Sequence, residues 1–348
     1  MPLTAIPCPE NLSLIRYDVQ LLAGPQGLVL PPYKGSTFRG GFAGTFRRLV
    51  CSTGRRQCKP CELKYTCPYA LVFESEPPPG AEALRNYDNV PRPFILEPPL
   101  EEKKEYNPGE PLVFSLILIG CAASLLPYFI VTLDEFGRRG IGRGRRPFIL
   151  DRVTAVNPLT GEAAVIYQHP ERVVRPRELG VTARDVWRRA EEELAGDGSP
   201  SGVHIAFLTP TRITYSGRPA RTPAFHVIIR NLLRRISSLC YFYHGFSYRA
   251  DFPDIIRRAM EISLVQERTR WYVWERYSSR QDQKVPLGGF VGEAVYAGPV
   301  REFWPLLRLG ELVHVGKGTV FGQGKFVASP CGGEENSVQA LGTARCLQ

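Results

Sequence analysis

Four cysteines in the first third of the chain have the spacing of metal ligands. Six, two and five residues separate them, in the order Cys51, Cys58, Cys61 and Cys67. Four thiolates can bind zinc in a tetrahedral arrangement, and the same set can bind an iron–sulfur cluster. Clustered cysteines indicate a metal in a reducing compartment and not a disulfide framework. We therefore expect a structural Zn²⁺, with an iron–sulfur cluster as the alternative, in a cytoplasmic protein.

The chain has five histidines, the side chains best suited to proton transfer near neutral pH. His226 and His244 share one face of a predicted helix, but about 27 Å separates them, which is too far for both to act on one reacting group. His226 falls in the first helical turn, where the helix dipole favours anions and lowers the pKa of a histidine. His226 and His244 are therefore separate candidates for acid–base catalysis, and an ordinary partly exposed histidine is the alternative for His226.

Two glycine-rich basic loops occupy matching places in the two halves of the chain. The first, GRRGIGRGRRPF, spans 137–148, and the second, GKGTVFGQGKF, spans 316–326. Glycine allows the backbone to approach a ligand and to turn its N–H groups toward it, and the cationic side chains between the glycines indicate an anion. The repetition predicts a duplicated fold that binds a long polyanion.

The overall charge agrees with an anionic partner. The formal net charge is +10 and the isoelectric point is about 9.2. In a soluble chain this balance indicates nucleic acid first and an anionic membrane surface second. Charge that serves only solubility is the alternative, but here the basic residues gather around glycines and on predicted helices. Residues 1–10 also lack the basic and apolar regions of a signal peptide.

One uncharged segment, 112–133, is long enough to span a bilayer. Gly120 interrupts it, Pro127 follows, and charged residues flank it closely. A buried strand followed by a packed helix accounts for the same residues. We therefore expect no membrane span.

The order of predicted elements is similar in the two halves. The first half has a strand over 12–22, a basic helix over 37–50 capped by Ser36 or Thr37, a proline-rich surface stretch over 77–108, and the apolar strand and helix. The second half has strands over 203–208 and 290–296 and helices over 223–243, 254–264 and 300–309. A β-α-β…β-α-β order in each half is typical of the ferredoxin-like fold.

The sequence thus predicts an α+β protein with two tandem ferredoxin-like (RRM-like) domains, each with a C-terminal glycine-rich loop. The N-terminal domain is expected over 1–150, with the cysteine segment inserted at 51–67, and the C-terminal domain over 203–331. Between them, 151–202 forms a connector with a hairpin over 152–168 and a helix over 182–194. The remaining residues, 332–348, are expected to be disordered.

A set of short motifs occurs in a fixed order along nearly the whole chain. They are FRGGF at 38–42, FLTPTR at 207–212, LLRRI at 232–236, RYSSRQ at 276–281, LGGFVG at 287–292 and the loop at 316–324. In these motifs the chain resembles the RAMP superfamily of CRISPR-associated proteins, and most of all its precursor-RNA processing endoribonucleases. The resemblance implies cleavage of CRISPR repeat RNA without a metal in the reaction. In that reaction the ribose 2′-hydroxyl attacks the adjacent phosphate and leaves a 2′,3′-cyclic phosphate.

The chain departs from this family at one position. Many members place a catalytic histidine on or near the first helix, but 37–50 contains none. The catalytic residue is then His226 or His244, or a pair formed by Tyr33 and Lys34 in the turn before that helix. Acid–base cleavage also needs a cation for the charge that develops on the phosphate. Most tyrosines in such turns simply pack, which is the alternative for Tyr33.

Basic residues on helices and in the loops are the expected RNA contacts. Arg230 and Arg234 are four residues apart and share a helix face. Contacts of this kind give affinity and salt dependence, whereas stacked bases give specificity. His314 borders the second loop, and core packing is its alternative role. The full set of candidates is Arg39, Arg47, Arg48, Arg143, Arg145, Arg230, Arg234, Arg235, Arg276, Arg280, His314, Lys317 and Lys325.

The aromatic residues Trp271, Tyr272, Trp274 and Tyr277 could stack on bases or belong to a core strand. A non-catalytic RAMP subunit that binds guide RNA within a CRISPR effector complex is the main alternative function. The missing histidine in 37–50 favours that alternative, and the ordered motifs favour the enzyme. A general RNA-binding protein outside CRISPR systems is a third hypothesis.

Overall fold

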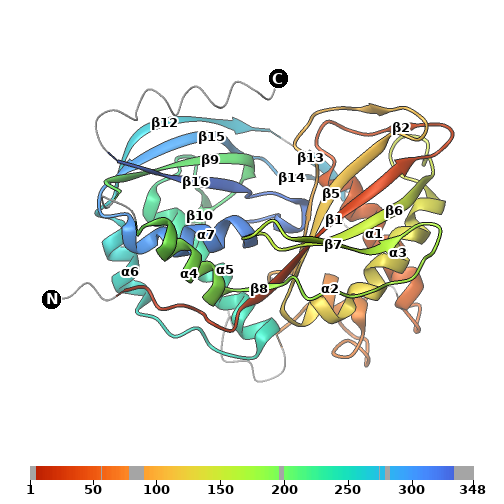
Figure 1. The fold of residues 1–348 in the computed structure, drawn as a ribbon, viewed down its shortest axis with the longest axis horizontal. Helices are drawn as coiled ribbons and strands as arrows, with labels where there is room; N and C mark the ends of the chain where they lie inside the picture. Colours follow the sequence, from red (N-terminus) through yellow and green to blue (C-terminus); the bar gives the residue numbers. More distant parts are fainter. Residues whose placement is uncertain are drawn as a thin grey trace.

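The computed structural model describes residues 5–55, 57–77, 90–195, 200–273, 275–278 and 283–332, with the side chains of 275–278 and 283–286 left aside. Two α+β domains lie side by side, and each contributes a sheet with helices on one face (Figure 1). The tail predicted over 332–348 lies outside the described residues apart from Gly332.

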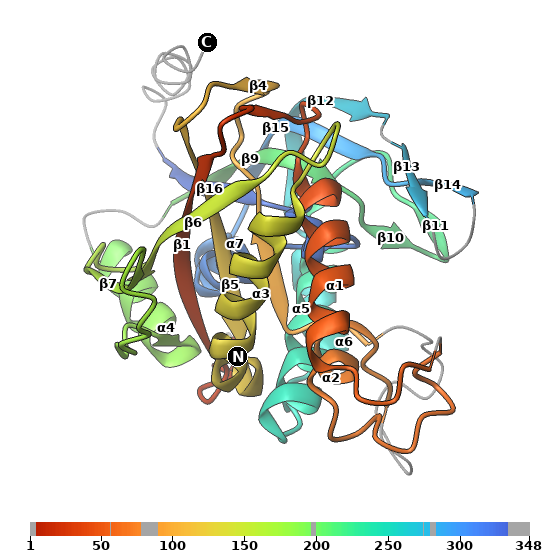
Figure 2. The same ribbon diagram turned by 90° about the vertical axis from the view of Figure 1, so that its right-hand side faces the viewer.

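The first domain has the ferredoxin-like order of elements. In chain order these are β1 (Ser13–Ala23), α1 (Gly35–Val50), β3 (Phe94–Glu97), β5 (Pro111–Ile119), α3 (Leu126–Arg139) and β6 (Phe148–Val156). The antiparallel sheet has the order β3-β5-β1-β6, and β7 (Ala163–Gln168) extends it beyond β6. The helices α1 and α3 pack side by side on this sheet (Figure 2), where a Cβ at Gly41 would lie 2.3 Å from the Phe136 ring.

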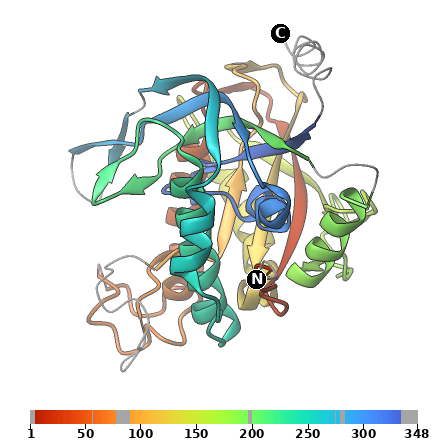
Figure 3. The same cartoon turned by 90° about the vertical axis from the view of Figure 1, so that its left-hand side faces the viewer.

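The second domain repeats the pattern. Its elements are β9 (Gly202–Thr211), α5 (Phe225–His244), β12 (Ser263–Tyr272), β15 (Gly289–Ala297), α7 (Trp304–Val313) and β16 (Phe326–Cys331). The sheet order β12-β15-β9-β16 is the same permutation as in the first domain, and α5 and α7 cover one face (Figure 3). The predicted duplicated ferredoxin-like fold is therefore confirmed. In both domains the glycine-rich loop joins the second helix to the last strand.

Smaller elements complete the chain. They are β2 (Leu28–Val29), α2 (Pro68–Phe73), β4 (Glu105–Tyr106), the 3₁₀ turn η1 (Gly120–Leu125), β8 (Val181–Thr182), α4 (Ala183–Glu193), β10 (Thr214–Tyr215), β11 (Arg218–Pro219), α6 (Phe252–Ala259), β13 (Glu275–Ser278), β14 (Gln283–Pro286), and the 3₁₀ turns η2 (Arg301–Phe303) and η3 (Thr319–Phe321).

The first sheet separates two apolar cores, because alternate residues of a strand point to opposite faces. In β5, Leu116 and Leu118 pack with the helices of the first domain, whereas Ile117 and Ile119 pack with the core of the second domain. The uncharged run in this region is thus a strand buried on both faces. Among the described residues, no helix is both long enough and apolar enough to cross a membrane.

The connector belongs partly to each domain. Its hairpin, β6 and β7, extends the first sheet, so the boundary predicted at residue 150 falls inside β6. Its helix α4 begins at a capping box in which Thr182 and Asp185 exchange hydrogen bonds. The buried Val186 and Trp187 of α4 join the core of the second domain. The predicted helix over 254–264 ends earlier than expected, at Ala259, and Leu264 lies in β12.

Candidate functional site

The second glycine-rich loop, residues 316–324, lies between the two domains. The Tyr33 hydroxyl, just before α1, donates a hydrogen bond to the carbonyl oxygen of Phe321 at 2.7 Å. Gly322 has a φ of 79°, and a Cβ on it would lie 2.3 Å from the Pro98 side chain. On the opposite side, the Thr209 hydroxyl donates to the Gly322 carbonyl oxygen at 2.8 Å. Residues of both domains therefore fix the path of this loop.

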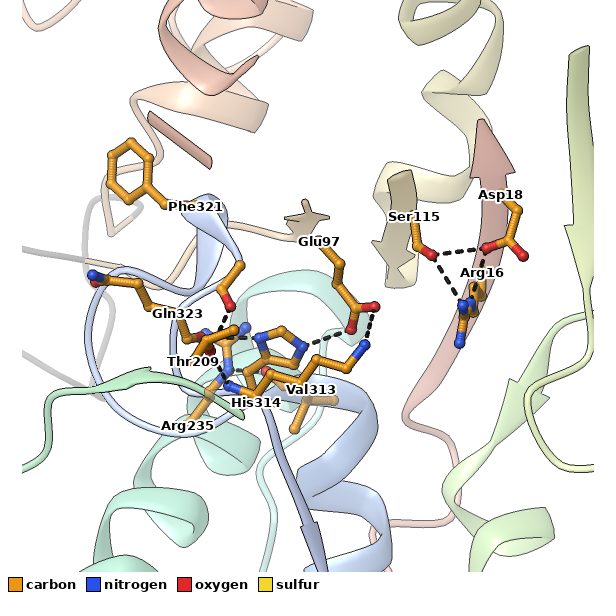
Figure 4. A network of polar contacts seen from close by, with 12 residues as sticks. Arg16, Asp18, Glu97, Ser115, Thr209, Arg235, Val313, His314, Phe321 and Gln323 are labelled. Carbon is orange, nitrogen blue, oxygen red and sulfur yellow. Dashed lines mark hydrogen bonds and ion pairs between the residues drawn. The ribbon is translucent and has the colours of Figure 1, made fainter. Parts of the chain in front are cut away.

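A buried carboxylate connects the loop to the first sheet. Glu97, the last residue of β3, accepts from His314 Nε2 at 2.7 Å and pairs with Lys325 Nζ at 2.7 Å (Figure 4). The opposite ring atom, His314 Nδ1, lies 2.9 Å from the Gln323 carbonyl oxygen. Burial opposes the charged form of Glu97, but the hydrogen bonds and charges of His314 and Lys325 outweigh it and lower its pKa to about 2.

This network changes the role of two residues predicted to contact RNA. His314 is fully buried, and Lys325 is largely buried against Glu97. Both side chains therefore support the loop from within the domain interface. Lys317, by contrast, is exposed on the loop, as an RNA contact requires.

A basic cavity of about 340 Å³ lies between the loop and α5. Cationic side chains line it from three separate segments: Arg92 before β3, Arg234 and Arg235 on α5, and Lys317 on the loop. Arg235 is only 6% exposed, and its Nε donates to the Val313 carbonyl oxygen at 2.6 Å. Within the described part of the chain its Nη2 has no hydrogen-bond partner. Burial lowers the pKa of Arg235 to about 10, so the guanidinium stays charged at neutral pH.

A second cavity of about 400 Å³ follows the same helix and shares Thr214, Asn231, Arg234 and Ser238 with the first. The Asn231 side chain holds α5 against β10, because its Nδ2 donates to the Thr214 carbonyl oxygen at 3.1 Å. Arg230 also lines the second cavity and is exposed. We call the two cavities together the α5 groove. Its charge and depth suit the phosphates of a nucleic acid.

His226 lies one turn before Arg230 on the same helix face. The ring is half-buried and meets Tyr215 edge to face, with 5.5 Å between centroids. Burial and the charge of Arg230 lower its pKa below the ordinary value, which leaves the imidazole neutral near pH 7. The pKa of His226 is therefore lowered as expected, with burial and Arg230 as the causes in place of the helix dipole.

The other histidine candidate has internal contacts. His244 Nε2 lies 2.9 Å from the backbone nitrogen of Ser13 and accepts its N–H, and Nδ1 lies 3.2 Å from the Leu239 carbonyl oxygen. This geometry joins the end of α5 to the start of β1. Both ring nitrogens are thus engaged in holding the two domains together.

The tyrosine–lysine pair before α1 is likewise tied to the backbone. Lys34 is fully buried, and its Nζ donates to the Glu101 carbonyl oxygen at 2.8 Å. Burial lowers the pKa of Lys34 and raises the pKa of Tyr33, which makes the Tyr33 hydroxyl a weaker acid. Both residues instead position the strand ends and the glycine-rich loop around them.

The remaining arginine candidates fall into separate places. Arg39 lies over the rings of Phe73 and Phe321, at 5.5 and 5.6 Å, and Arg47 lies over Tyr69 at 5.5 Å. Arg48 at the end of α1 is exposed, and desolvation together with the charges of Arg139 and Arg145 lowers its pKa. Arg143 and Arg145 are exposed on the first glycine-rich loop. That loop therefore forms a basic surface of the first domain.

Four further candidates fall outside the part of the chain that the structure describes in full. Arg280 and Trp274 lie outside the described residues, as do the side chains of Arg276 and Tyr277. Trp271 and Tyr272 end β12, where Trp271 packs partly against the core and Arg221 lies 5.5 Å from its ring. Trp271 is thus a partly buried strand residue.

The four clustered cysteines lie between α1 and α2 and line one small cavity of about 20 Å³. The Cys61 N–H donates to the Cys58 carbonyl oxygen at 2.9 Å, which forms a tight turn. The Thr53 hydroxyl lies 3.9 Å from Cys51 Sγ and 3.8 Å from Cys61 Sγ. Nevertheless, no three cysteine, histidine or acidic side chains in the described ranges are grouped closely enough to hold an ion. The ligand types fit a metal, but the thiols do not converge on one point.

Comparison with known proteins agrees with the duplicated fold and with the resemblance. Residues 12–179 match a family model described as an N-terminal domain, and residues 205–326 match the CRISPR-associated endoribonuclease Cas6. An uncharacterized protein of Archaeoglobus fulgidus is 24% identical over 305 residues, which cover 85% of this chain and 92% of that protein.

Two solved structures show the same architecture. A Cas6 of Thermus thermophilus is 17% identical, with a TM-score of 0.51 over 91% of this chain and 99% of that one. A partial Cas6-RT-Cas1–Cas2 complex contains a chain that is 12% identical, with a TM-score of 0.55 over 93% of this chain and 47% of the other. At these identities the likeness shows a shared fold. Residues 205–326 are in addition similar to the Cas6 endoribonuclease family, so the second half of the chain carries the family likeness.

Proposed function

We propose that this protein cleaves CRISPR repeat RNA during maturation of the precursor RNA, through attack by the ribose 2′-hydroxyl. The main support from the site is the unpaired Nη2 of Arg235, a buried cation that lines the basic cavity beside the second glycine-rich loop. A buried guanidinium nitrogen without a partner carries a desolvation cost unless a ligand anion completes its contacts. A backbone phosphate is such an anion.

In the proposed reaction His226 is the general base. Its neutral imidazole removes the proton from the 2′-hydroxyl, the 2′-oxygen bonds to phosphorus, and the bond from phosphorus to the 5′-oxygen breaks. The departing 5′-oxygen takes up a proton from solvent water, and His226 returns its proton to the solvent, so the products are a 2′,3′-cyclic phosphate and a 5′-hydroxyl. Arg230, one turn away, is placed to stabilise the charge on the phosphate. We assign His244, Tyr33 and Lys34 to positioning, because their polar atoms bond the backbone.

The alternative is a RAMP subunit that binds guide RNA in an effector complex without cutting it. The α5 groove serves either function, whereas only the enzyme needs a titrating group beside it. Because His226 occupies that position, we favour the enzyme. Membership of an effector complex is compatible with both.

The test is cleavage of labelled repeat RNA by the full chain in EDTA. A matched RNA should carry a single 2′-deoxy nucleotide at the cut site. We expect cleavage of the first RNA, with a cyclic phosphate at the new end, and at least a thousandfold slower cleavage of the second because its nucleophile is missing. Tight binding of both RNAs without cleavage would instead support the binding-subunit alternative. Equal cleavage of both would contradict 2′-hydroxyl attack.

We further propose that the cysteine segment binds a structural Zn²⁺, with an iron–sulfur cluster as the alternative. Cys51, Cys58, Cys61 and Cys67 line one cavity, and their thiolates are ligands that both groups prefer. Bound zinc would fix the chain between α1 and α2 and takes no part in the proposed cleavage. The support is the shared cavity and the turn at Cys58–Cys61.

Metal analysis of the purified protein tests this site. We expect about one zinc per chain, and its loss in a Cys58→Ser, Cys61→Ser variant, together with faster proteolysis of the segment around residue 60. Cys121→Ser, which removes an exposed thiol elsewhere, should keep the metal. Visible absorption with bound iron would select the cluster, and metal-free wild-type protein that resists proteolysis would contradict the site.

A further inference from the structure

A third cavity, of about 390 Å³, continues from the α5 groove toward the cysteine segment. It shares Tyr241 with the 400 Å³ cavity and Val90 with the 340 Å³ cavity. Figure 3 shows the segments involved, with the C-terminal end of α5 beside the loops between α1 and α2. We call this cavity the aromatic pocket. Its volume lies within the range of about 300–1,000 Å³ that is usual for sites that hold small organic groups.

The lining of the aromatic pocket differs from that of the groove. Tyr65 is 49% exposed, and Tyr241 and Phe242 are half-buried, whereas the groove is lined by arginines. Lys64 Nζ lies 5.0 Å from the Tyr65 ring and 3.3 Å from a Glu76 carboxylate oxygen, so its charge is already paired. The pocket therefore offers flat apolar surfaces with a polar rim and little free positive charge.

A firm framework holds these rings. The buried Tyr243 hydroxyl donates to the Pro91 carbonyl oxygen at 2.6 Å and lies 2.9 Å from Ser75 Oγ, which joins the end of α5 to the first domain. Arg92, which lines the basic cavity, donates to the Ser75 carbonyl oxygen at 2.9 Å. The contacts of Tyr243 and Arg92 with Ser75 and Pro91 thus lie between the basic cavity and the aromatic pocket.

We propose that the aromatic pocket binds an unpaired nucleobase of the RNA whose phosphates occupy the α5 groove. Bases stack on aromatic side chains in most single-stranded RNA sites, and each stacked base contributes free energy without adding salt dependence. Arginines suit the phosphates and aromatic rings suit the bases, and the two surfaces adjoin along one helix. The inference rests on the proposed function, because it assigns a second subsite for the same RNA.

The test compares two RNAs that differ only in length. One is the repeat alone with a 2′-deoxy cut site, and the other carries several unpaired nucleotides on each side. Fluorescence anisotropy should show that Tyr65→Ala and Tyr241→Ala each weaken binding of the extended RNA by roughly 5- to 150-fold and leave the short RNA within about threefold of wild type. The slope of affinity against salt should not change, since no phosphate contact is lost.

Matched variants separate stacking from folding. Tyr65→Phe and Tyr241→Phe keep the ring and should retain wild-type affinity, and Tyr128→Ala removes a tyrosine of similar exposure on α3 and should have no effect. Unchanged affinity of the alanine variants for the extended RNA would overturn the inference. A protein partner would then be the alternative ligand of the aromatic pocket. An equal loss for both RNAs would overturn it too. Failure of the proposed function is distinct, because the wild-type protein would then leave a repeat RNA with an intact 2′-hydroxyl uncut, whatever the variants do to binding.

Discussion

Replacing His226 by alanine should slow RNA cleavage by about 10²–10⁴-fold, the usual contribution of a general base. Affinity for the uncleavable 2′-deoxy RNA should stay within about threefold of wild type, because the phosphates are held by arginines. Single-turnover cleavage and equilibrium binding measure the two quantities separately. His204→Ala is the matched control, since His204 pairs with Glu293 on the second sheet. The His204→Ala protein should cut RNA at the wild-type rate.

The pH dependence gives an independent readout for His226. A general base must be unprotonated, so kcat/KM should rise with pH through the pKa of His226 and then become level. Because burial and Arg230 lower that pKa, the midpoint of the rise should lie below the ordinary histidine value of about 6.5. In His226→Ala this acidic limb should disappear. A profile identical to wild type, or unchanged cleavage, would remove His226 from the mechanism.

Glu97→Gln should cause the largest loss of stability of any substitution considered, about 3–5 kcal/mol of unfolding free energy. The buried carboxylate faces His314 at 2.7 Å and Lys325 at 2.7 Å, and a neutral amide would leave their charge unbalanced. Urea unfolding monitored by circular dichroism measures the change. Glu293→Gln, in the more exposed pair with His204, is the matched control and should lose less than about 1 kcal/mol.

The same carboxylate makes stability depend on pH in acid. The folded-state pKa of Glu97 is about 2, below the unfolded value of about 4.3, so its contribution is present in full above that unfolded value. As the pH falls from about 4 to 2 the contribution, about 3 kcal/mol, is lost. Glu97→Gln should therefore flatten the stability profile in this range. If Glu97→Gln and Glu293→Gln lowered the free energy of unfolding equally, the buried ion pair would stabilise the fold no more than the exposed one.

The sequence predicted the fold well where local patterns determine it. The alternation in β1, the apolar run of β5 and the helical pattern of α4 each depend on neighbours in the chain. It failed at β3, a four-residue strand inside a proline-rich stretch that we expected on the surface. This strand is buried because it pairs with β5, and a short run gives no periodicity from which to predict that.

The candidate site was predicted in part for the same reason. The spacing of Arg230 and Arg234 correctly placed both on one face of a helix. Glu97 was missed because its partners, His314 and Lys325, are 217 and 228 residues away in sequence. Arg92 was missed because nothing in its local sequence indicates that it meets α5. A buried apolar run that ends in glutamate, as in FILE at 94–97, was the available signal.

The two glycine-rich loops occupy equivalent positions in the repeated fold, but different contacts hold them in place. The loop of the first domain forms hydrogen bonds within its own domain. For example, the Arg143 N–H donates to the Val29 carbonyl oxygen at 3.0 Å. The loop of the second domain depends on Tyr33 and Glu97 of the first. Ligand binding at the second loop and association of the two domains are therefore thermodynamically linked. RNA that binds there raises the free energy needed to separate the domains, and any loosening of their contact lowers the affinity for RNA by the same amount.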